Sequence, residues 1–118
     1  MTAMRIALAL LLALSACSSQ SPDERAQTQE VDALAPLKTK YSGVVMGFDF
    51  KPHDTLVVSL DLQNYDGMND DDQDRMKKDI IAAWRSAWQQ AHPGQHATIQ
   101  TQIIDFVGRT IARQQASV

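Results

Sequence analysis

The strongest structural signal in this chain is a helical stretch, Asn69-Asp-Asp-Asp-Gln-Asp-Arg-Met-Lys-Lys-Asp-Ile-Ile-Ala-Ala-Trp-Arg-Ser-Ala-Trp-Gln-Gln-Ala-His-Pro-Gly94. Its apolar residues recur with the period of a helix and fall within roughly a 140° arc at about 100° per residue. They are Met76, Ile80, Ala83, Trp84, Ala87 and Ala91. Asn69 or one of the three aspartates after it can cap the first amides, and Pro93-Gly94 stops the helix. The sequence therefore predicts an amphipathic helix that packs through one face.

Two strands are predicted before this helix. Apolar residues alternate with other residues from 44 to 50 and again from 56 to 62, and a turn at 51–54 separates the two segments. The apolar positions are Val44, Met46, Phe48 and Phe50 in the first segment and Leu56, Val58, Leu60 and Leu62 in the second. We expect the two segments to form a hairpin with one apolar face.

Two further strands are predicted after the helix. The alternation returns at Ala97, Ile99, Thr101 and Ile103, a turn follows at 105–108, and a short last strand covers 109–113. A C-terminal helix over 104–114 remains an alternative, because several apolar residues there also match helical spacing. The order ββαββ predicts an α+β two-layer sandwich over residues 39–115. In it the amphipathic helix packs on one face of an antiparallel sheet.

Composition narrows the class of protein. Of the 118 residues, 44% are hydrophobic and 21% are charged, which is ordinary for a globular domain. The formal net charge is −3. Nucleic acid is therefore not expected as a partner, since phosphate binding needs a concentrated basic face. Cys17 is the single cysteine, so no disulfide can form within the chain.

The first twenty residues have the three parts of a signal peptide. Arg5 is followed by an uninterrupted apolar run from Ile6 to Leu14 and then by small residues up to Cys17. As a helix the apolar run rises about 14 Å, roughly half of the hydrocarbon core of a bilayer. The run therefore favours a cleavable signal over a transmembrane helix.

The end of this segment, Leu14-Ser-Ala-Cys17, resembles the lipobox of bacterial lipoproteins. The resemblance covers only about the first 17 residues. It implies that residues 1–16 are removed and that a diacylglycerol, with fatty acids such as palmitate, is attached to the sulfur of Cys17. In that class an Asp after the cysteine is associated with retention at the inner membrane, and this chain has Ser18. We therefore expect an outer-membrane anchor facing the periplasm, with the inner membrane as the alternative.

Residues 17–38 are predicted to hold the lipidated cysteine and a flexible tether. The segment is rich in Ser, Gln and acidic residues and has no aromatic residue. A reach of roughly 25 Å is expected for a flexible chain of this length. A short helix at 31–37 is possible, although Pro36 argues against a longer one.

Two groups of residues are weak candidates for a metal site. His92, His96 and the distant His53 could offer imidazoles to zinc or copper, but Pro93-Gly94 separates the first two. The acidic stretch 66–74 lacks the glycine and glutamate positions of a calcium loop, and capping of the helix explains it better. We therefore expect no metal and no cofactor.

The remaining candidates concern binding to a partner. Trp88 and Ile81 are predicted to lie at the margin of the apolar arc, where an exposed aromatic residue could anchor a partner. The sheet face not covered by the helix is predicted to carry Val45, Val57, Gln100, Gln102 and Ile104. No catalytic constellation is recognisable, so an enzyme is not expected. The leading function is a lipid-anchored interaction or structural module of the cell envelope, with an envelope protein or a second copy as partner. The alternative is a periplasmic binding module for a metal ion or small ligand.

Overall fold

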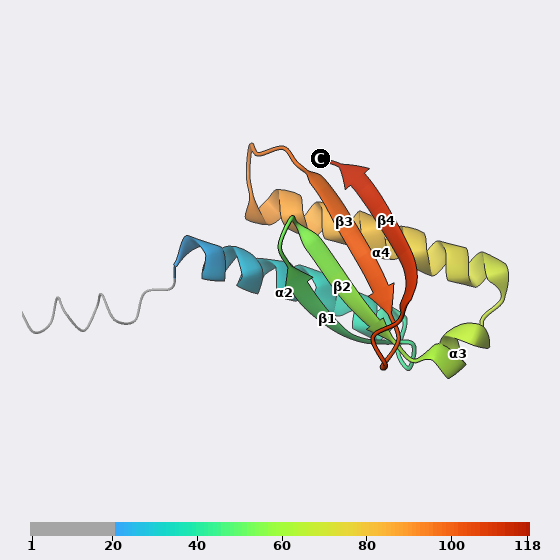
Figure 1. Cartoon of the computed structure of the whole chain (residues 1–118). Helices are drawn as coiled ribbons and strands as arrows, with labels where there is room; N and C mark the ends of the chain where they lie inside the picture. Colours follow the sequence, from blue (N-terminus) through green and yellow to red (C-terminus); the bar gives the residue numbers. More distant parts are fainter. Residues whose placement is uncertain (1–20) are drawn as a thin grey trace, which may run out of the picture.

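The computed structural model describes residues 21–118, and the predicted signal peptide and Cys17 lie outside them. This part of the chain forms an α+β fold with a four-stranded sheet and two long helices (Figure 1). The elements are α2 (Pro22–Lys40), β1 (Val45–Lys51), β2 (Thr55–Leu60), α3 (Leu62–Asp66), α4 (Asp70–Ala91), β3 (Thr98–Ile104) and β4 (Thr110–Ser117). Within residues 21–118, no helix has the length and apolar content needed to cross a bilayer.

The sheet is mixed, which corrects the expected antiparallel sheet. Its order is β1-β2-β3-β4 (Figure 1). The β1/β2 and β3/β4 pairs are antiparallel, whereas β2 and β3 run parallel. The cause is the connection between them, since α4 carries the chain back to the end of the sheet where β2 began. The predicted ββαββ order is also incomplete, because α2 precedes β1 and the short α3 precedes α4.

Helix α4 agrees with its sequence pattern. The side chain of Asn69 accepts a hydrogen bond from the backbone N–H of Asp72 at 2.8 Å, and His92 follows the last turn as the C-cap. Pro93 and Gly94, which has φ of 73°, then direct the chain away from the helix. At the C-terminus β4 is a strand, so the alternative of a C-terminal helix is wrong.

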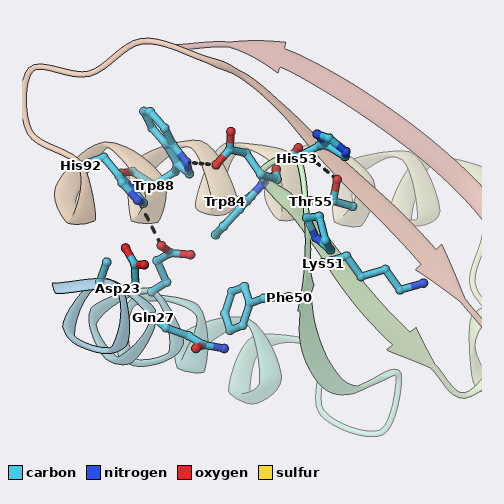
Figure 2. A pocket seen from close by; sticks show the side chains of 13 residues that line it. Asp23, Gln27, Phe50, Lys51, His53, Thr55, Trp84, Trp88 and His92 are labelled. Carbon is cyan, nitrogen blue, oxygen red and sulfur yellow. Dashed lines mark hydrogen bonds and ion pairs between the residues drawn. The ribbon is translucent and has the colours of Figure 1, made fainter. Parts of the chain in front are cut away.

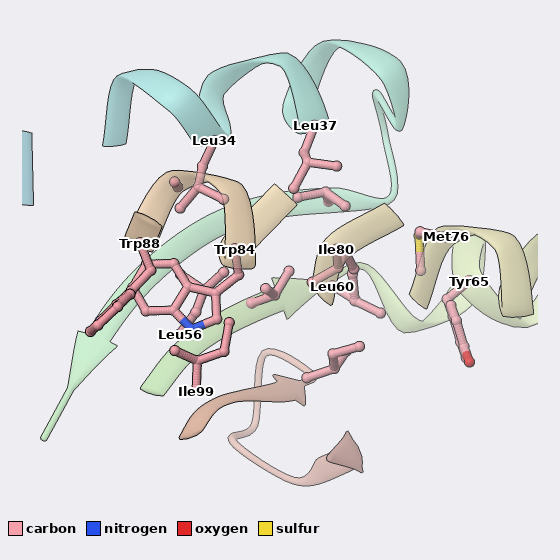
Figure 3. Close-up of a cluster of buried hydrophobic side chains, with 14 residues drawn as sticks. Leu34, Leu37, Leu56, Leu60, Tyr65, Met76, Ile80, Trp84, Trp88 and Ile99 are labelled. Atoms are coloured by element: carbon pink, nitrogen blue, oxygen red, sulfur yellow. The ribbon is translucent and has the colours of Figure 1, made fainter. Parts of the chain in front are cut away.

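Helix α2 replaces most of the predicted tether. Its first turn is closed by a capping box, in which the Ser21 hydroxyl accepts from the Glu24 N–H and the Glu24 carboxylate accepts from the Ser21 N–H. Leu34 and Leu37, three residues apart, are buried against α4 and the sheet (Figure 3). Pro36 lies inside the helix at an exposed position. The prediction of a flexible segment is therefore wrong for residues 22–38, and the folded domain begins before residue 39.

Polar contacts join the end of α2 to α4. The Lys40 ammonium lies 2.7 Å from the Asp79 carboxylate, and the Tyr41 hydroxyl donates to the same carboxylate. These two hydrogen bonds hold the pKa of Asp79 below its ordinary value. Burial, together with the bond to Asp79, raises the pKa of Tyr41 to about 12. Both ends of α2 are thus defined, one by its own cap and the other by α4.

The core lies between the sheet and the two helices. Figure 3 shows side chains of α2, α4 and the sheet meeting in one cluster. Its buried members are Leu34, Leu37, Val45, Leu56, Val58, Leu60, Tyr65, Met76, Ile80, Trp84, Ala87, Trp88, Ile99 and Ile103. Val45 was expected on the uncovered sheet face, but the register shifts between Val45 and Gly47 and turns Val45 into the core. The same shift leaves Met46 exposed.

Leu34→Ala should lower the free energy of unfolding by about 2 to 5 kcal/mol, because the removed methyl groups are completely buried and leave a cavity. Val31→Ala is the matched control on the same helix, since Val31 is 48% exposed, and it should change stability by less than about 0.5 kcal/mol. Urea unfolding followed by tryptophan emission measures both. Equal and small effects would contradict a structural role for α2.

Candidate ligand-binding cleft

A cleft of about 470 Å³ lies where α2, the β1–β2 turn and the end of α4 meet (Figure 2). α2 contributes residues of its first half, and α4 contributes residues of its last two turns and its C-cap. The lining residues are Asp23, Ala26, Gln27, Glu30, Phe50, Lys51, Pro52, His53, Asp54, Thr55, Trp84, Trp88 and His92. Three elements that are distant in the sequence therefore form one site.

The β1–β2 turn is fixed to α4 through Asp54. The main-chain carbonyl of Asp54 accepts a hydrogen bond from Trp84 Nε1 at 3.1 Å, and its side-chain Oδ1 accepts one from Trp88 Nε1 at 3.0 Å (Figure 2). Asp54 has φ of 54° and the preceding His53 has φ of 66°. Aspartate and histidine adopt this left-handed region more readily than most residues. Two buried indoles thus hold a turn in a conformation that is uncommon for residues other than glycine.

Trp88 is not at an exposed margin of α4, and that prediction is wrong. Its side chain is only 3% exposed, because its ring lies in the buried cluster between the sheet and the helices and its Nε1 donates to Asp54. One ring face stacks on His92, with centroids 4.5 Å apart and planes inclined by 19°. Ile81 is half-buried against the core and does not line the cleft. Trp88 is therefore not available as an exposed anchor, Ile81 has the marginal position predicted for it, and Trp84 is a core residue as expected.

Glu30 is the unusual residue of the cleft. Its side chain is 8% exposed, and no donor among residues 21–118 makes a hydrogen bond to its carboxylate. The nearest cationic partner is His92, whose Nδ1 lies 3.9 Å from Glu30 Oε1 and only 3.0 Å from the carbonyl oxygen of Trp88. Burial raises the pKa of Glu30 above its ordinary value of 4.5, His92 opposes this shift, and Asp54 adds to it. A largely buried carboxylate, paired only with His92 and still open to the solvent of the cleft, therefore lines this site.

The three histidines do not converge. His92 and His53 line the cleft from opposite sides (Figure 2), and His96 is outside it, with its Nδ1 3.1 Å from the Val118 carbonyl oxygen. In the part of the chain that the structure describes, no group of three or more His, Cys, Asp or Glu residues is placed to hold a metal ion. The aspartates of the stretch 66–74 include Asp70, Asp71 and Asp72, which occupy the first turn of α4 as the capping prediction requires.

A second surface lies at the β3–β4 turn. Phe106 and Val107 are 67% and 80% exposed. The buried Asp105 holds this turn, because its carboxylate accepts from the backbone N–H groups of Val107 and Arg109 and from Arg109 Nε, at 2.9 to 3.0 Å. These bonds hold the pKa of Asp105 below its ordinary value despite burial. Two large apolar side chains are thus presented on a braced turn.

Only some of the residues that line the cleft could be predicted from the sequence. Glu30 lies in the segment that was predicted to be a tether, and its one signal is a spacing of four residues from Leu34, which places both on one side of a helix. Asp54 was recognised as a turn residue, but nothing in the sequence pairs it with two tryptophans 30 and 34 positions later. Comparison of the chain with protein-family models, with curated proteins and with solved structures finds no match.

Glu30→Gln should change how stability depends on pH. A carboxyl group whose pKa is raised by folding contributes stability that is full below its unfolded pKa and is lost as pH rises through its folded pKa. The glutamine variant cannot lose this contribution, so its stability relative to the parent should increase as pH rises from 4 to 7. Urea unfolding at each pH measures the difference. Asp32→Asn, at an exposed position of α2, should keep the parent's profile, and a parallel profile for Glu30→Gln would contradict the burial of a charged group.

Proposed function

We propose that this chain is a lipoprotein, anchored at the outer membrane through Cys17, whose periplasmic domain binds a small ligand in the cleft. The single observation that carries the binding role is the carboxylate of Glu30, which is largely buried, faces the cleft and has His92 at 3.9 Å as its one ion-pair partner among the described residues. A largely buried carboxylate keeps only part of its hydration, and a ligand with a suitable donor would add hydrogen bonds to it. The proposed role is binding rather than catalysis.

The form of the cleft supports this role. Its volume of about 470 Å³ is within the range of small-molecule sites. Aromatic side chains and a few polar groups line it, which is the usual composition of such sites. The bonds from Trp84 and Trp88 to Asp54 hold two of its walls in place before any ligand enters. A preformed site loses less conformational entropy on binding.

The proposed address rests on the sequence of the first 18 residues. Arg5, the apolar run and the lipobox ending at Cys17 occur in the order of a lipoprotein signal, and Ser18 follows the cysteine. Two or more acyl chains anchor a protein stably, whereas one gives only reversible binding. Cys17 is the only position in the chain where such a thioether can form.

Cys17→Ala should move the protein from the membrane fraction to the soluble fraction of lysed cells, because no other acylation site remains. Ser19→Ala is the matched control, and it should fractionate like the parent. Immunoblots of both fractions, together with metabolic labelling by an alkynyl palmitate analogue, measure the effect. A Cys17→Ala variant that stays membrane-bound would show that the proposed anchor is wrong.

Docking to a protein partner is the second candidate function. The observation that favours it is the exposure of Phe106 and Val107 on a turn that Asp105 holds rigid. Exposed aromatic and aliphatic side chains on an ordered turn supply contact area with little loss of entropy. This surface takes the place of the buried Trp88 in the interaction hypothesis.

A ligand that enters the cleft should change the tryptophan emission, because the only two tryptophans of the chain both line it. We expect a saturable change with at least one member of a panel of glucose, citrate, spermidine, octanoate and zinc chloride. Ala26→Met should weaken that response at least about tenfold by filling the cleft, whereas Ala35→Met, at an exposed position of the same helix, should not. A flat response to the whole panel would contradict the binding role and leave docking as the remaining candidate.

A further inference from the structure

We infer that the ligand of the cleft is an organic cation, with a primary ammonium group that binds the Glu30 carboxylate and an aliphatic body that lies against Phe50. This inference rests on the proposed binding function and specifies its ligand. It follows from the hydrogen-bonding groups, the charges and the apolar surface of the cleft.

The buried hydrogen-bonding groups of the cleft leave acceptors free and donors occupied. Trp84 Nε1 and Trp88 Nε1 both donate to Asp54, and His92 Nδ1 lies at hydrogen-bonding distance from the Trp88 carbonyl oxygen. The Glu30 carboxylate, in contrast, receives no hydrogen bond from residues 21–118. A ligand that supplies donors therefore complements the part of the cleft around Glu30. An ammonium group has three donors and no acceptor.

The charges of the cleft select a cation in the same way. Three carboxylates line it, those of Asp23, Glu30 and Asp54, against one ammonium group, that of Lys51. Figure 2 shows the Lys51 side chain extending away from His92 and Trp88, and Lys51 makes no ion pair with a carboxylate of the described residues. The negative charge beside His92 is therefore not neutralised by this lysine. Opposite charges attract, and solvent screens that attraction less at the largely buried Glu30 than at the exposed Asp23 and Asp54.

The ligand should be organic rather than a bare metal ion. The side chains of Phe50 and Ala26 line the cleft and are only half-buried, which leaves apolar surface for an aliphatic body. Each methylene group that leaves water there strengthens binding. Metal ligation would need several converging donors, but His53 and His92 lie on opposite sides and His92 Nδ1 is close to a carbonyl oxygen (Figure 2).

Three five-carbon probes test the inference on the full-length chain in detergent: n-pentylamine, 1-pentanol and pentanoate. The three probes have the same aliphatic chain length and differ in the charge of the head group. Calorimetric titration at pH 7 therefore measures which charge the cleft binds most tightly. We expect n-pentylamine to bind at least about tenfold more tightly than 1-pentanol and pentanoate to show no saturable binding, because a hydrogen-bonded charge pair contributes about that factor. Tighter binding of 1-pentanol or pentanoate would overturn the inference.

Substitutions test which carboxylate binds the ammonium group. Glu30→Gln should weaken the binding of n-pentylamine at least about tenfold and leave the binding of 1-pentanol unchanged. Asp32 is an exposed acid of α2 that does not line the cleft, so Asp32→Asn should bind both probes like the parent. Asp54→Asn keeps an oxygen for Trp88 Nε1 and should weaken the amine as well. Circular dichroism confirms that each variant is folded. Unchanged amine binding in Glu30→Gln overturns the inference. If n-pentylamine does not bind but glucose, citrate or octanoate does, the inferred ligand class is wrong and the proposed binding function is still supported.

Discussion

The cleft depends on the pairing of Asp54 with two indoles. A buried indole N–H needs an acceptor. Helix α4 carries two buried indoles, one turn apart, and both donate to the same residue of the β1–β2 turn. Asp54 serves both because it offers a main-chain carbonyl to Trp84 and a carboxylate oxygen to Trp88. The β1–β2 hairpin is thereby held against α4 at the end that leads to β3. Without this pairing, the residues on either side of the cleft would have no fixed separation.

Helix α2 gives the same region its burial. By packing along α4 it places Glu30 beside His92. Desolvation of the Glu30 carboxylate destabilises this arrangement. Other contacts of α2 offset the loss, namely the burial of Leu34 and Leu37 and the hydrogen bonds of Lys40 and Tyr41 to Asp79. Stability and binding thus have different sources within α2: its second half packs and pairs, and its first half lines the cleft.

The sequence predicts those elements whose pattern is strong and local. The apolar arc of α4, its Asn69 cap and both hairpins follow from periodicity and turn residues. Only a short helix at 31–37 was considered within α2, because few residues of α2 are apolar and Pro36 argued against a longer helix, whereas packing on α4 stabilises its full length. The burial of Trp88 was missed as well, because its partner Asp54 lies 34 positions earlier in the chain. The cleft joins Glu30, Asp54 and His92 from three elements, so a local pattern could not predict it.

The early start of α2 limits where the domain can work. Only three residues separate Cys17 from the helix cap Ser21, so an anchored domain would begin within about 14 Å of its lipid even if that linker were fully extended. The first residues of α2 to follow, Asp23 and Ala26, already line the cleft. An anchored molecule would therefore encounter its ligand close to the membrane surface.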